Sequence, residues 1–506
     1  MKRLLLPLAL LLGCASSPTT SAPASNGTIA ITASPAEGSA VVWPDEEFRY
    51  TQPSARQPAE LDIPPVERFT IEPGIDVYLA SRPELPTVSL WMSFPTGSMT
   101  DPAGKRGRTS VCMSLVSQGT KTLDKVAFEE KQADLASSVW ANSGSESLST
   151  GVSSLKRTLE PTLDLWVEML REPGMRQGDL DRIKAARKAS LAQNKSAPGS
   201  LGRRLWSSVV MGPEHPYGRV TTEKDYSSIT KRDCEKFLKT LGPQNAQLFV
   251  AGAMTKAEVE SMIGGRLEDW KGSTSTPDVP PEPAPRSGGI FFADIPGAAQ
   301  SQIYVGHPGP QRGAKDYEAN RLVAAILGGS FSGRVNMNLR EDKGFAYGAR
   351  ARFSYYKHAG VFAMSSSVRS DATAASIGEL LKELERMRTE PVTLDELQRE
   401  QDAAVASLPA MFSTSRRLLS TYSNLVFYGL PLDYYDAFVG RISDQGIANL
   451  RTSARNNLQA SDLSILVVGD GESVLPTLLK LAQDENLGGG TVTVLDADGR
   501  VVRTVR

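Results

Sequence analysis

The sequence predicts an α+β fold in which two homologous α/β-sandwich domains, each an antiparallel sheet covered by helices, follow one another along the chain. Three observations predict it. The 506 residues are too many for a single hydrophobic core. Residues 273–288, STSTPDVPPEPAPRSG, are nearly free of large apolar side chains and typical of an extended linker. The segments on either side repeat one order of strands and helices.

The N-terminus is typical of a secreted protein. Lys2 and Arg3 precede an apolar run over residues 4–13, which is too short to span a bilayer and predicts a cleaved signal peptide. Residues 11–14, Leu-Leu-Gly-Cys, are similar to a bacterial lipobox, in which the cysteine is lipidated. The alternative is a generic signal peptide in which Cys14 is accidental.

The segment that follows favours the lipoprotein, because residues 15–59, rich in Ser, Ala and Pro, are typical of a tether and cannot bury a core. We therefore expect residues 1–14 to be a signal peptide ending in lipidated Cys14. The lipid would anchor the chain in the bacterial cell envelope. Ala15, rather than Asp, after the cysteine favours the outer membrane, facing the periplasm.

The remaining chain divides at the linker. We expect an N-terminal domain over 60–272, the linker over 273–288, a C-terminal domain over 289–485, and a C-terminal hairpin over 486–506, where TVTVLDADGRVVRTV alternates around Asp-Gly.

The two halves repeat the same elements. Strand-like runs at 87–99 and 301–310 end in Pro-Thr-Gly and Pro-Gly-Pro. Later, an aromatic-Gly turn (215–219 and 426–431) precedes a helix with an expected N-cap at Thr230 or Ser443, since a hydroxyl can accept from the free N–H groups of a first turn. A buried strand follows in each half, AQLFVAG (246–252) and LSILVVG (463–469), and then another helix. The order predicts a tandem duplication.

Two further helices are predicted in the first half. In 159–173 the apolar residues Leu163, Trp166, Met169 and Leu170 share one face, and Pro173 ends the helix. Residues 180–197 contain strong helix formers up to a Pro-Gly pair.

Charge and cysteine content limit the possible functions. The 56 basic and 57 acidic residues are mixed, and no basic block suggests a nucleic-acid partner. If Cys14 is lipidated, Cys112 and Cys234 are the remaining thiols. Two thiols are no disulfide framework for so long a chain, and Cys112 lies on an apolar helical face and is expected in the core. Whether the two form a bridge stays open.

With these elements in place, the chain resembles the pitrilysin or insulinase family of zinc metallopeptidases, the inverzincins, which includes mitochondrial processing peptidase and bacterial relatives. LGGSFSGRVNMNLREDKGFAYGARA (327–351) is close to the family's second-domain signature. DPAGKRGRTSVCMSLVSQGT (101–120) and residues 194–219 match its first domain in frame and spacing. The resemblance covers roughly residues 60–485 and implies the two-domain fold of processing peptidases.

The resemblance also implies where a zinc site would lie. Active members carry H-x-x-E-H on a helix that ends in Gly-Thr: two histidines bind zinc and the glutamate activates the metal-bound water. Counted back from Gly119-Thr120, these positions are Ser110, Met113 and Ser114. A serine hydroxyl is a poor zinc ligand, and methionine cannot take a proton.

The third zinc ligand of the family, a glutamate on a later helix, corresponds to Ser190. The three histidines, His215, His307 and His358, are too far apart in sequence to form any H-x-x-E-H motif. We expect His215 in a structural turn and the other two at strand edges or the surface. The chain is therefore expected to hold no metal or cofactor and to be inactive alone.

One pair of family residues is retained. In active members an arginine and a tyrosine, seven residues apart in the second domain, reach the peptide and help stabilise the reacting carbonyl. They match Arg340 and Tyr347 in LREDKGFAY. Guanidinium and phenol are donors that can be aimed at a developing oxyanion. The alternative is structural, with Arg340 paired to an acidic neighbour and Tyr347 packed at a strand start.

Loss of the zinc residues with retention of this pair predicts a non-catalytic subunit. It would pair with a zinc-bearing homologue and supply one wall of a peptide-degrading chamber, with the zinc in the partner chain. Peptide substrates would be held partly by addition to a strand edge. One alternative is an envelope scaffold or peptide-binding lipoprotein without a protease partner. An independent peptidase with a relocated metal site is the least favoured.

Overall fold

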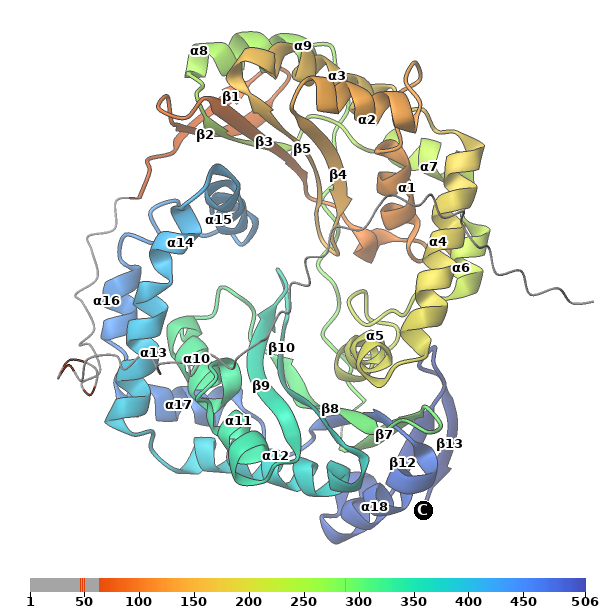
Figure 1. The fold of residues 1–506 in the computed structure, drawn as a ribbon, viewed down its shortest axis with the longest axis vertical. Coiled ribbons are helices and arrows are strands. Elements are labelled where there is room, and N and C mark those ends of the chain that lie inside the picture. The colour runs from red at the N-terminus through yellow and green to blue at the C-terminus, as the bar shows by residue number, and fades with distance from the viewer. Residues whose placement is uncertain (1–45, 47, 49, 51–62, 287) are drawn as a thin grey trace, which may run out of the picture. The chain divides into compact units, whose positions relative to one another are not determined.

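Two sheets, one on each side of the Pro-rich segment 273–288, organise the chain (Figure 1). The computed structural model describes residues 46, 48, 50, 63–286 and 288–506. The expected signal peptide, Cys14 and nearly all of the tether lie outside these residues. The chain separates into units Met1–Gln57 and Pro58–Arg506, and both sheets belong to the second. No described helix has the length and apolar character required to cross a membrane.

The first sheet has six strands in the order β1-β2-β6-β3-β5-β4. Neighbouring strands are antiparallel except for the parallel pair β2–β6. In β3, Val88, Leu90, Met92 and Phe94 are buried and alternate with less buried residues, as the period of two requires. The strands are β1 (Glu67–Ile71), β2 (Ile75–Ser81), β3 (Thr87–Phe94), β4 (Ser138–Ser143), β5 (Leu148–Leu155) and β6 (Gln247–Gly252).

Helices cover the core face of this sheet. In α3 the predicted stripe of Leu163, Trp166, Met169 and Leu170 is buried. The helices are α1 (Arg108–Val116), α2 (Lys125–Asp134), α3 (Leu159–Arg171), α4 (Gln177–Lys195), α5 (Pro198–Met211), α6 (Glu223–Ser228), α7 (Lys231–Leu238), α8 (Lys256–Glu258) and α9 (Gly265–Leu267), with a π-helical segment Val259–Gly264 between the last two.

The second sheet has seven strands in the order β13-β12-β7-β11-β8-β10-β9. β7 is parallel to both β11 and β12, and the other neighbours are antiparallel. The predicted C-terminal hairpin forms β12 and β13 and extends this sheet through β7. The strands are β7 (Gly289–Asp294), β8 (Gln300–Gly309), β9 (Ala346–Tyr355), β10 (Gly360–Arg369), β11 (Ser464–Gly469), β12 (Val492–Leu495) and β13 (Val501–Val505).

The helices of the second half pack around its own buried cluster of apolar side chains. They are α10 (Tyr317–Ala324), α11 (Arg334–Asn336), α12 (Thr373–Thr389), α13 (Leu394–Ala406), α14 (Leu408–Phe412), α15 (Ser415–Phe427), α16 (Phe438–Ser443), α17 (Ile447–Asn457) and α18 (Gly471–Asp484). π-helical segments follow α10 (Ala325–Gly329) and α11 (Met337–Asp342).

The predicted duplication is visible in the strand order. β3 lies between β6 and β5, and its counterpart β8 lies between β11 and β10. The predicted α+β class with two sheets is confirmed, although each sheet is mixed rather than purely antiparallel.

One helix from each half also packs on the sheet of the other half. α5 packs on β8 and β11 of the second sheet, where Leu205 and Val209 join a cluster with Phe291 and Leu466. α15 packs on β6 and β3 of the first sheet, where Leu418 and other apolar residues join a second cluster. Figure 1 shows both helices beside the sheets that they cover. The two halves therefore share cores across the linker.

The linker itself has neither helix nor strand over its described residues, apart from an isolated bridge at Ser273. It is held against the end of α5, because the backbone N–H groups of Ala284 and Arg286 donate to the carbonyls of Met211 and Val209 at 3.0 and 2.8 Å.

One of the two expected N-caps is confirmed. Thr230 caps α7 in a capping box, with its hydroxyl accepting from the Asp233 N–H and the Asp233 side chain accepting from the Thr230 N–H. The expectation for Ser443 is wrong. Ser443 is the last residue of α16, and α17 begins after Gly446. The buried side chains of Phe438 and Ile442 hold the preceding residues in a helix of their own.

Candidate functional site

Helix α1 carries the positions at which the family resemblance implies a zinc motif. Ser110 and Ser114 lie four residues apart and are both partly exposed, so the helix presents them on one side. Met113 is 1% exposed and packs in the buried apolar cluster between the first sheet and its helices. The structure therefore brings the two serines together on the surface of α1 and separates Met113 from them.

Helix α4 carries the expected third position and packs against α1. Ser190 is exposed. The contact between the helices is made one turn earlier, where Arg187 Nη2 donates to Ser114 Oγ at 3.0 Å. Further along, Arg182 Nη2 donates to Gln118 Oε1 at 2.7 Å. These arginines were not predicted, because charges on a surface helix usually indicate only a solvated face.

These residues do not fit a zinc ion. Zinc binds imidazole, thiolate and carboxylate groups, whereas α1 presents hydroxyls and α4 presents a guanidinium. The positive charge of Arg187 lies next to Ser114, where a divalent cation would be repelled. No reaction step of this chain is therefore assigned to a metal at this place.

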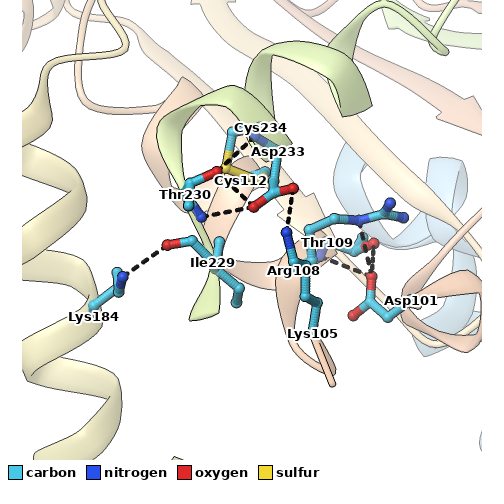
Figure 2. Close-up of a disulfide and its surroundings, with 10 residues drawn as sticks. All are labelled: Asp101, Lys105, Arg108, Thr109, Cys112, Lys184, Ile229, Thr230, Asp233 and Cys234. Atoms are coloured by element: carbon cyan, nitrogen blue, oxygen red, sulfur yellow. Dashed lines mark hydrogen bonds and ion pairs between the residues drawn. A yellow bond between two sulfur atoms is a disulfide. The ribbon is translucent and has the colours of Figure 1, made fainter. Parts of the chain in front are cut away.

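A disulfide fixes α1 from its other side. Cys112 on α1 and Cys234 on α7 are bonded, and both are fully buried (Figure 2). The core position expected for Cys112 is confirmed, and the question of pairing is answered. An even number of cysteines after the expected lipidated one was the only signal for it in the sequence.

The N-terminus of α1 is capped from outside the helix. Its N-cap residue, Gly107, has φ 86° and no side chain to offer. The buried carboxylate of Asp101 instead accepts from the Gly107 N–H at 2.8 Å. It also accepts from the Thr109 N–H at 3.0 Å (Figure 2). Burial raises the pKa of Asp101, although the hydrogen bonds from Thr109 oppose that rise.

An ion pair joins the approach to α1 to the start of α7. Lys105 Nζ lies 2.6 Å from Asp233 Oδ1, next to the disulfide. Burial opposes ionisation of Asp233, but Lys105 and the capping Thr230 outweigh it and lower the pKa of Asp233 to about 2. The N-terminus of α1 is thus held by Asp101 and its buried side by the disulfide to α7.

The retained pair of the second domain lies together at the surface. Arg340 belongs to the π-helical segment Met337–Asp342, and Tyr347 is the second residue of β9. The Arg340 guanidinium lies over the Tyr347 ring, 4.9 Å from its centre, and over the Phe331 ring at 4.7 Å. Tyr347 is 87% exposed and Phe331 is 66% exposed.

The alternative, a purely structural role for this pair, agrees with the contacts of Arg340 but not with those of Tyr347. Arg340 Nε does lie 3.0 Å from Glu341 Oε1, as that alternative expected. Tyr347, however, is the most exposed of the large hydrophobic residues in the described chain, so it does not pack at the strand start. We call Phe331, Arg340 and Tyr347 the aromatic–arginine cluster. Phe331 was not predicted, because nothing local links it to the other two.

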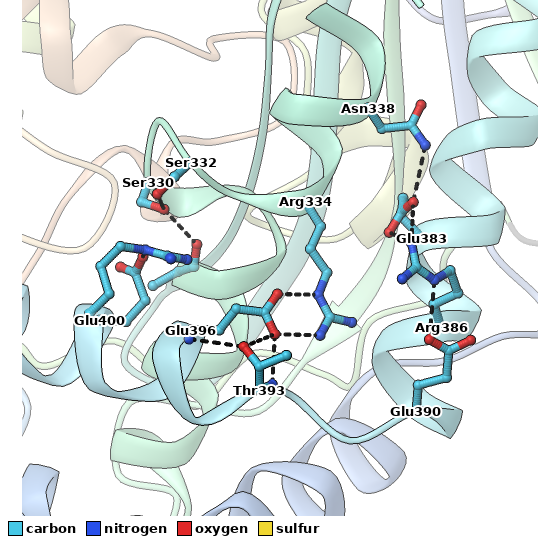
Figure 3. Close-up of polar contacts among 12 residues, drawn as sticks. Ser330, Ser332, Arg334, Asn338, Glu383, Arg386, Glu390, Thr393, Glu396 and Glu400 are labelled. Carbon is cyan, nitrogen blue, oxygen red and sulfur yellow. Dashed lines mark hydrogen bonds and ion pairs between the residues drawn. The ribbon is translucent and has the colours of Figure 1, made fainter. Parts of the chain in front are cut away.

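A buried polar frame holds the cluster in place. Asn336 Nδ2 donates to the Phe331 carbonyl at 2.6 Å, and Asn336 Oδ1 accepts from the Ala349 N–H at 3.0 Å. The same side chain therefore ties the loop of Phe331 to the strand of Tyr347. Arg334 Nε and Nη2 donate to the two oxygens of Glu396 at 2.7 and 2.8 Å (Figure 3).

This bidentate ion pair anchors α11 to α13. Glu396 also accepts from the Thr393 N–H in a capping box. Burial by itself would raise the pKa of Glu396, but Arg334 and Thr393 lower it to about 2. Arg340 follows Arg334 in the same continuous helical segment, so the ion pair supports the residues that present it.

Comparison with known proteins shows the family to which this fold belongs. The family described as "Insulinase (Peptidase family M16)" matches residues 76–211, and "Peptidase M16 inactive domain" matches residues 228–404. The chain belongs to the insulinase family, peptidase family M16. Within that family it is an inactive homologue.

Relatives with different names share this fold. The chain is 20% identical over 394 residues to the "non-peptidase homolog YmxG" of Helicobacter pylori, covering 76% of this chain and 90% of that one. It is 22% identical over 329 residues to an "uncharacterized zinc protease" of Rickettsia felis, covering 64% and 78%. The crystal structure of a peptidase M16 inactive domain from Pseudomonas fluorescens matches with a TM-score of 0.73 and 21% identity, over 80% of this chain and 98% of that one.

The three histidines of this insulinase-family chain belong to three different segments of the fold. His215 lies in the turn after α5, as expected, and His358 is exposed in the β9–β10 turn. The expectation for His307 is wrong. It is 1% exposed in β8, an interior strand, and its ring nitrogens contact the Pro308 carbonyl at 2.7 Å and the Gln459 N–H at 3.1 Å.

Proposed function

We propose that this chain is the non-catalytic subunit of a zinc peptidase of the bacterial envelope. It pairs with a zinc-bearing homologue and contributes the aromatic–arginine cluster to the wall of their common peptide chamber. The observation that carries the proposal is the exposed packing of Arg340 between the rings of Phe331 and Tyr347. The expected metal positions of the same chain are serines, and the side chain of one of them, Ser114, accepts a hydrogen bond from Arg187.

The chemistry of the cluster suits an extended peptide. The guanidinium and the phenol are hydrogen-bond donors that can meet a peptide carbonyl, or the oxyanion that forms from it at a metal held by the partner. Stacking between two rings limits the rotamers of Arg340, so less side-chain entropy is lost when it donates. Two large aromatic side chains left in water are themselves typical of a contact surface.

The disulfide supports the proposed location. Disulfides persist in oxidising compartments such as the periplasm and are rare in the cytosol. The buried Cys112–Cys234 bond therefore supports export of this chain. Lipidation of Cys14 would then hold the subunit and its partner at the membrane.

Reconstitution with a zinc-bearing homologue tests the proposal. The two chains are co-expressed, and cleavage of an unfolded peptide is measured together with complex formation by size-exclusion chromatography. Arg340→Ala and Tyr347→Phe should each lower kcat/KM by about tenfold, the effect of a lost charge-assisted contact, and leave assembly intact. The control is Arg503→Ala, which removes an exposed arginine of β13 outside the cluster.

Three outcomes would count against the proposal. Unchanged turnover in both cluster variants would contradict the assigned roles. Failure of every zinc-bearing homologue of the same cell to bind the chain would favour an envelope scaffold or peptide-binding lipoprotein instead. Chelator-sensitive cleavage by the isolated chain would favour a relocated metal site.

A further inference from the structure

The first sheet has an uncovered region beside α15. There α15 lies over β6 and β3, while β5 and the edge strand β4 continue past it (Figure 1). A cavity of about 470 Å³ lies between these strands and α15, and Trp91, Trp140 and Arg416 are among its lining residues. Such a volume is within the range of small-ligand sites and holds one or two amino-acid residues.

Two tryptophans form the aromatic part of this cavity. Trp91 on β3, Gly151 on β5 and Trp140 on β4 lie opposite one another in register. The two rings meet edge to face, with centres 5.7 Å apart and planes at 86°. A Cβ atom on Gly151 would lie 2.4 Å from the Trp140 ring, so only glycine lets that ring lie across β5.

The rest of the cavity is polar and carries one positive charge. Its lining includes Ser89, Ser149 and Ser153, whose hydroxyls bond to no other side chain in the described chain. Trp91 Nε1 is buried and, among the described residues, has no acceptor. Arg416 is exposed and has no acidic partner in the part of the chain that the structure describes. The cavity thus offers aromatic surface, hydrogen-bond donors and a free guanidinium.

We propose that this cavity binds the C-terminal residue of an extended peptide when that residue is aromatic. The ring packs against Trp140 and Trp91, and the terminal carboxylate pairs with Arg416 and the neighbouring hydroxyls. An aromatic ring and a carboxylate enter one small cavity together when they belong to the same residue. A carboxylate is the anion that a guanidinium binds best in a planar geometry.

The edge strand β4 would bind the residues of the peptide that precede its C-terminal residue. β4 pairs with β5 on one side and with no other described strand. The Val139 N–H of this strand already donates to Gln132 Oε1 at 2.6 Å, so an extended chain would add to the edge beyond Val139. Alternate side chains of that chain would face the open side of the sheet. Binding is a property of this chain alone, so the inference does not depend on the proposed zinc-bearing partner.

Fluorescence anisotropy with labelled peptides tests the inference on the full chain in mild detergent. The probe is Gly-Ala-Thr-Ser-Phe, labelled at its N-terminus and with a free C-terminus. The comparison peptides are its C-terminal amide and the version that ends in Ala. We expect each comparison peptide to bind about tenfold more weakly, the cost of losing a charge-assisted pair or a buried ring. Equal binding of the acid and the amide would overturn the inference.

Variants of the cavity complete the test. Trp140→Ala and Arg416→Gln should each weaken binding of the free-acid peptide by about fivefold or more. The matched control is Arg417→Gln, which changes the next exposed arginine of α15, outside the cavity lining. Trp140→Phe, which keeps an aromatic ring, should restore most of the binding. If Trp140→Ala does not fold, Arg416→Gln still decides, since its side chain is exposed. Wild-type affinity in Arg416→Gln would contradict the proposal.

Discussion

The Arg187 guanidinium donates to Ser114 Oγ at 3.0 Å and thereby joins α4 to α1. Ser114 is the position at which the family resemblance implies a zinc-binding histidine in active members. A fixed positive charge thus lies beside a position that would otherwise receive a metal cation. The expected ligand position is thus a serine, and it is in contact with an arginine that opposes zinc binding.

Restoring zinc affinity should require removal of Arg187 as well as return of the ligands. We compare Ser110→His/Ser114→His/Ser190→Glu with and without Arg187→Ala. The version lacking Arg187 should bind zinc at least about tenfold more tightly, because repulsion between two nearby cations is relieved. Competition with a chromophoric chelator measures the affinities. Equal zinc affinities in the two versions would show that the arginine has no such effect.

Loss of the disulfide should destabilise the first half. Cys112 and Cys234 are 122 residues apart in sequence, and closing a loop of that length stabilises a fold by about 2–5 kcal/mol, mainly through the unfolded chain. The double variant Cys112→Ala/Cys234→Ala should therefore unfold at lower urea concentration. Reductant should lower the midpoint of the wild-type chain toward that of the variant and leave the variant unchanged. Identical midpoints without reductant would contradict this account.

Acid should destabilise the protein through His307. Burial lowers the pKa of this histidine to about 4 from its ordinary 6.5, although the Pro308 carbonyl partly opposes the shift. Between these values the unfolded chain binds more protons than the folded one, so stability is present above pH 6.5 and is lost as the pH falls through 4. The loss from this group amounts to about 3 kcal/mol at pH 4.

Urea unfolding between pH 4 and 7 measures this effect. His307→Gln should remove the corresponding slope of stability against pH. His358→Gln, at an exposed position, should keep it. A wild-type slope in His307→Gln would show that other groups determine the acid response.

Breaking the Arg334–Glu396 pair should loosen the support of the aromatic–arginine cluster. Their side chains are only 12% and 18% exposed, so Arg334→Gln leaves a mostly buried carboxylate without its partner and should cost about 3 kcal/mol. The control is Arg369→Gln, which breaks a well-exposed pair with Asp371 and should cost much less, because water screens the exposed charges. Equal unfolding free energies for the two variants would contradict the assigned difference.

The Arg334–Glu396 pair should also make the stability of the protein depend on pH. The pKa of Glu396 is held at about 2, below its ordinary 4.5, so the stability that it contributes is present above pH 4.5 and is lost as the pH falls through 2. Arg334→Gln should lose this component of acid sensitivity, which acid titration of the unfolding midpoint measures.

Local patterns were sufficient to predict most regular elements. Alternation in β3, the helical stripe of α3 and the hydroxyl of Thr230 each act within one element, so the sequence displays them. The prediction that Ser443 is an N-cap was wrong. Its hydroxyl is typical of an N-cap, but the buried side chains just before it make Ser443 the end of a helix. The prediction for His307 was wrong because its contacts, with Phe362 of β10 and with the Gln459 N–H, come from segments distant in sequence.

The site was predictable only in part, for the same reason. Counting from family motifs led to the positions on α1 and to Arg340 and Tyr347. It did not lead to Arg187, Asp101 or Phe331, whose roles arise from contacts across the fold. The tryptophan cavity likewise depends on strand register and on a glycine between two rings.

The most direct test of the central claim is to isolate the full chain from its native membranes in mild detergent and identify what accompanies it by mass spectrometry. We predict a homologue carrying H-x-x-E-H in near-stoichiometric amount. The chain alone, or with unrelated envelope proteins, would contradict its role as the non-catalytic half of a zinc peptidase.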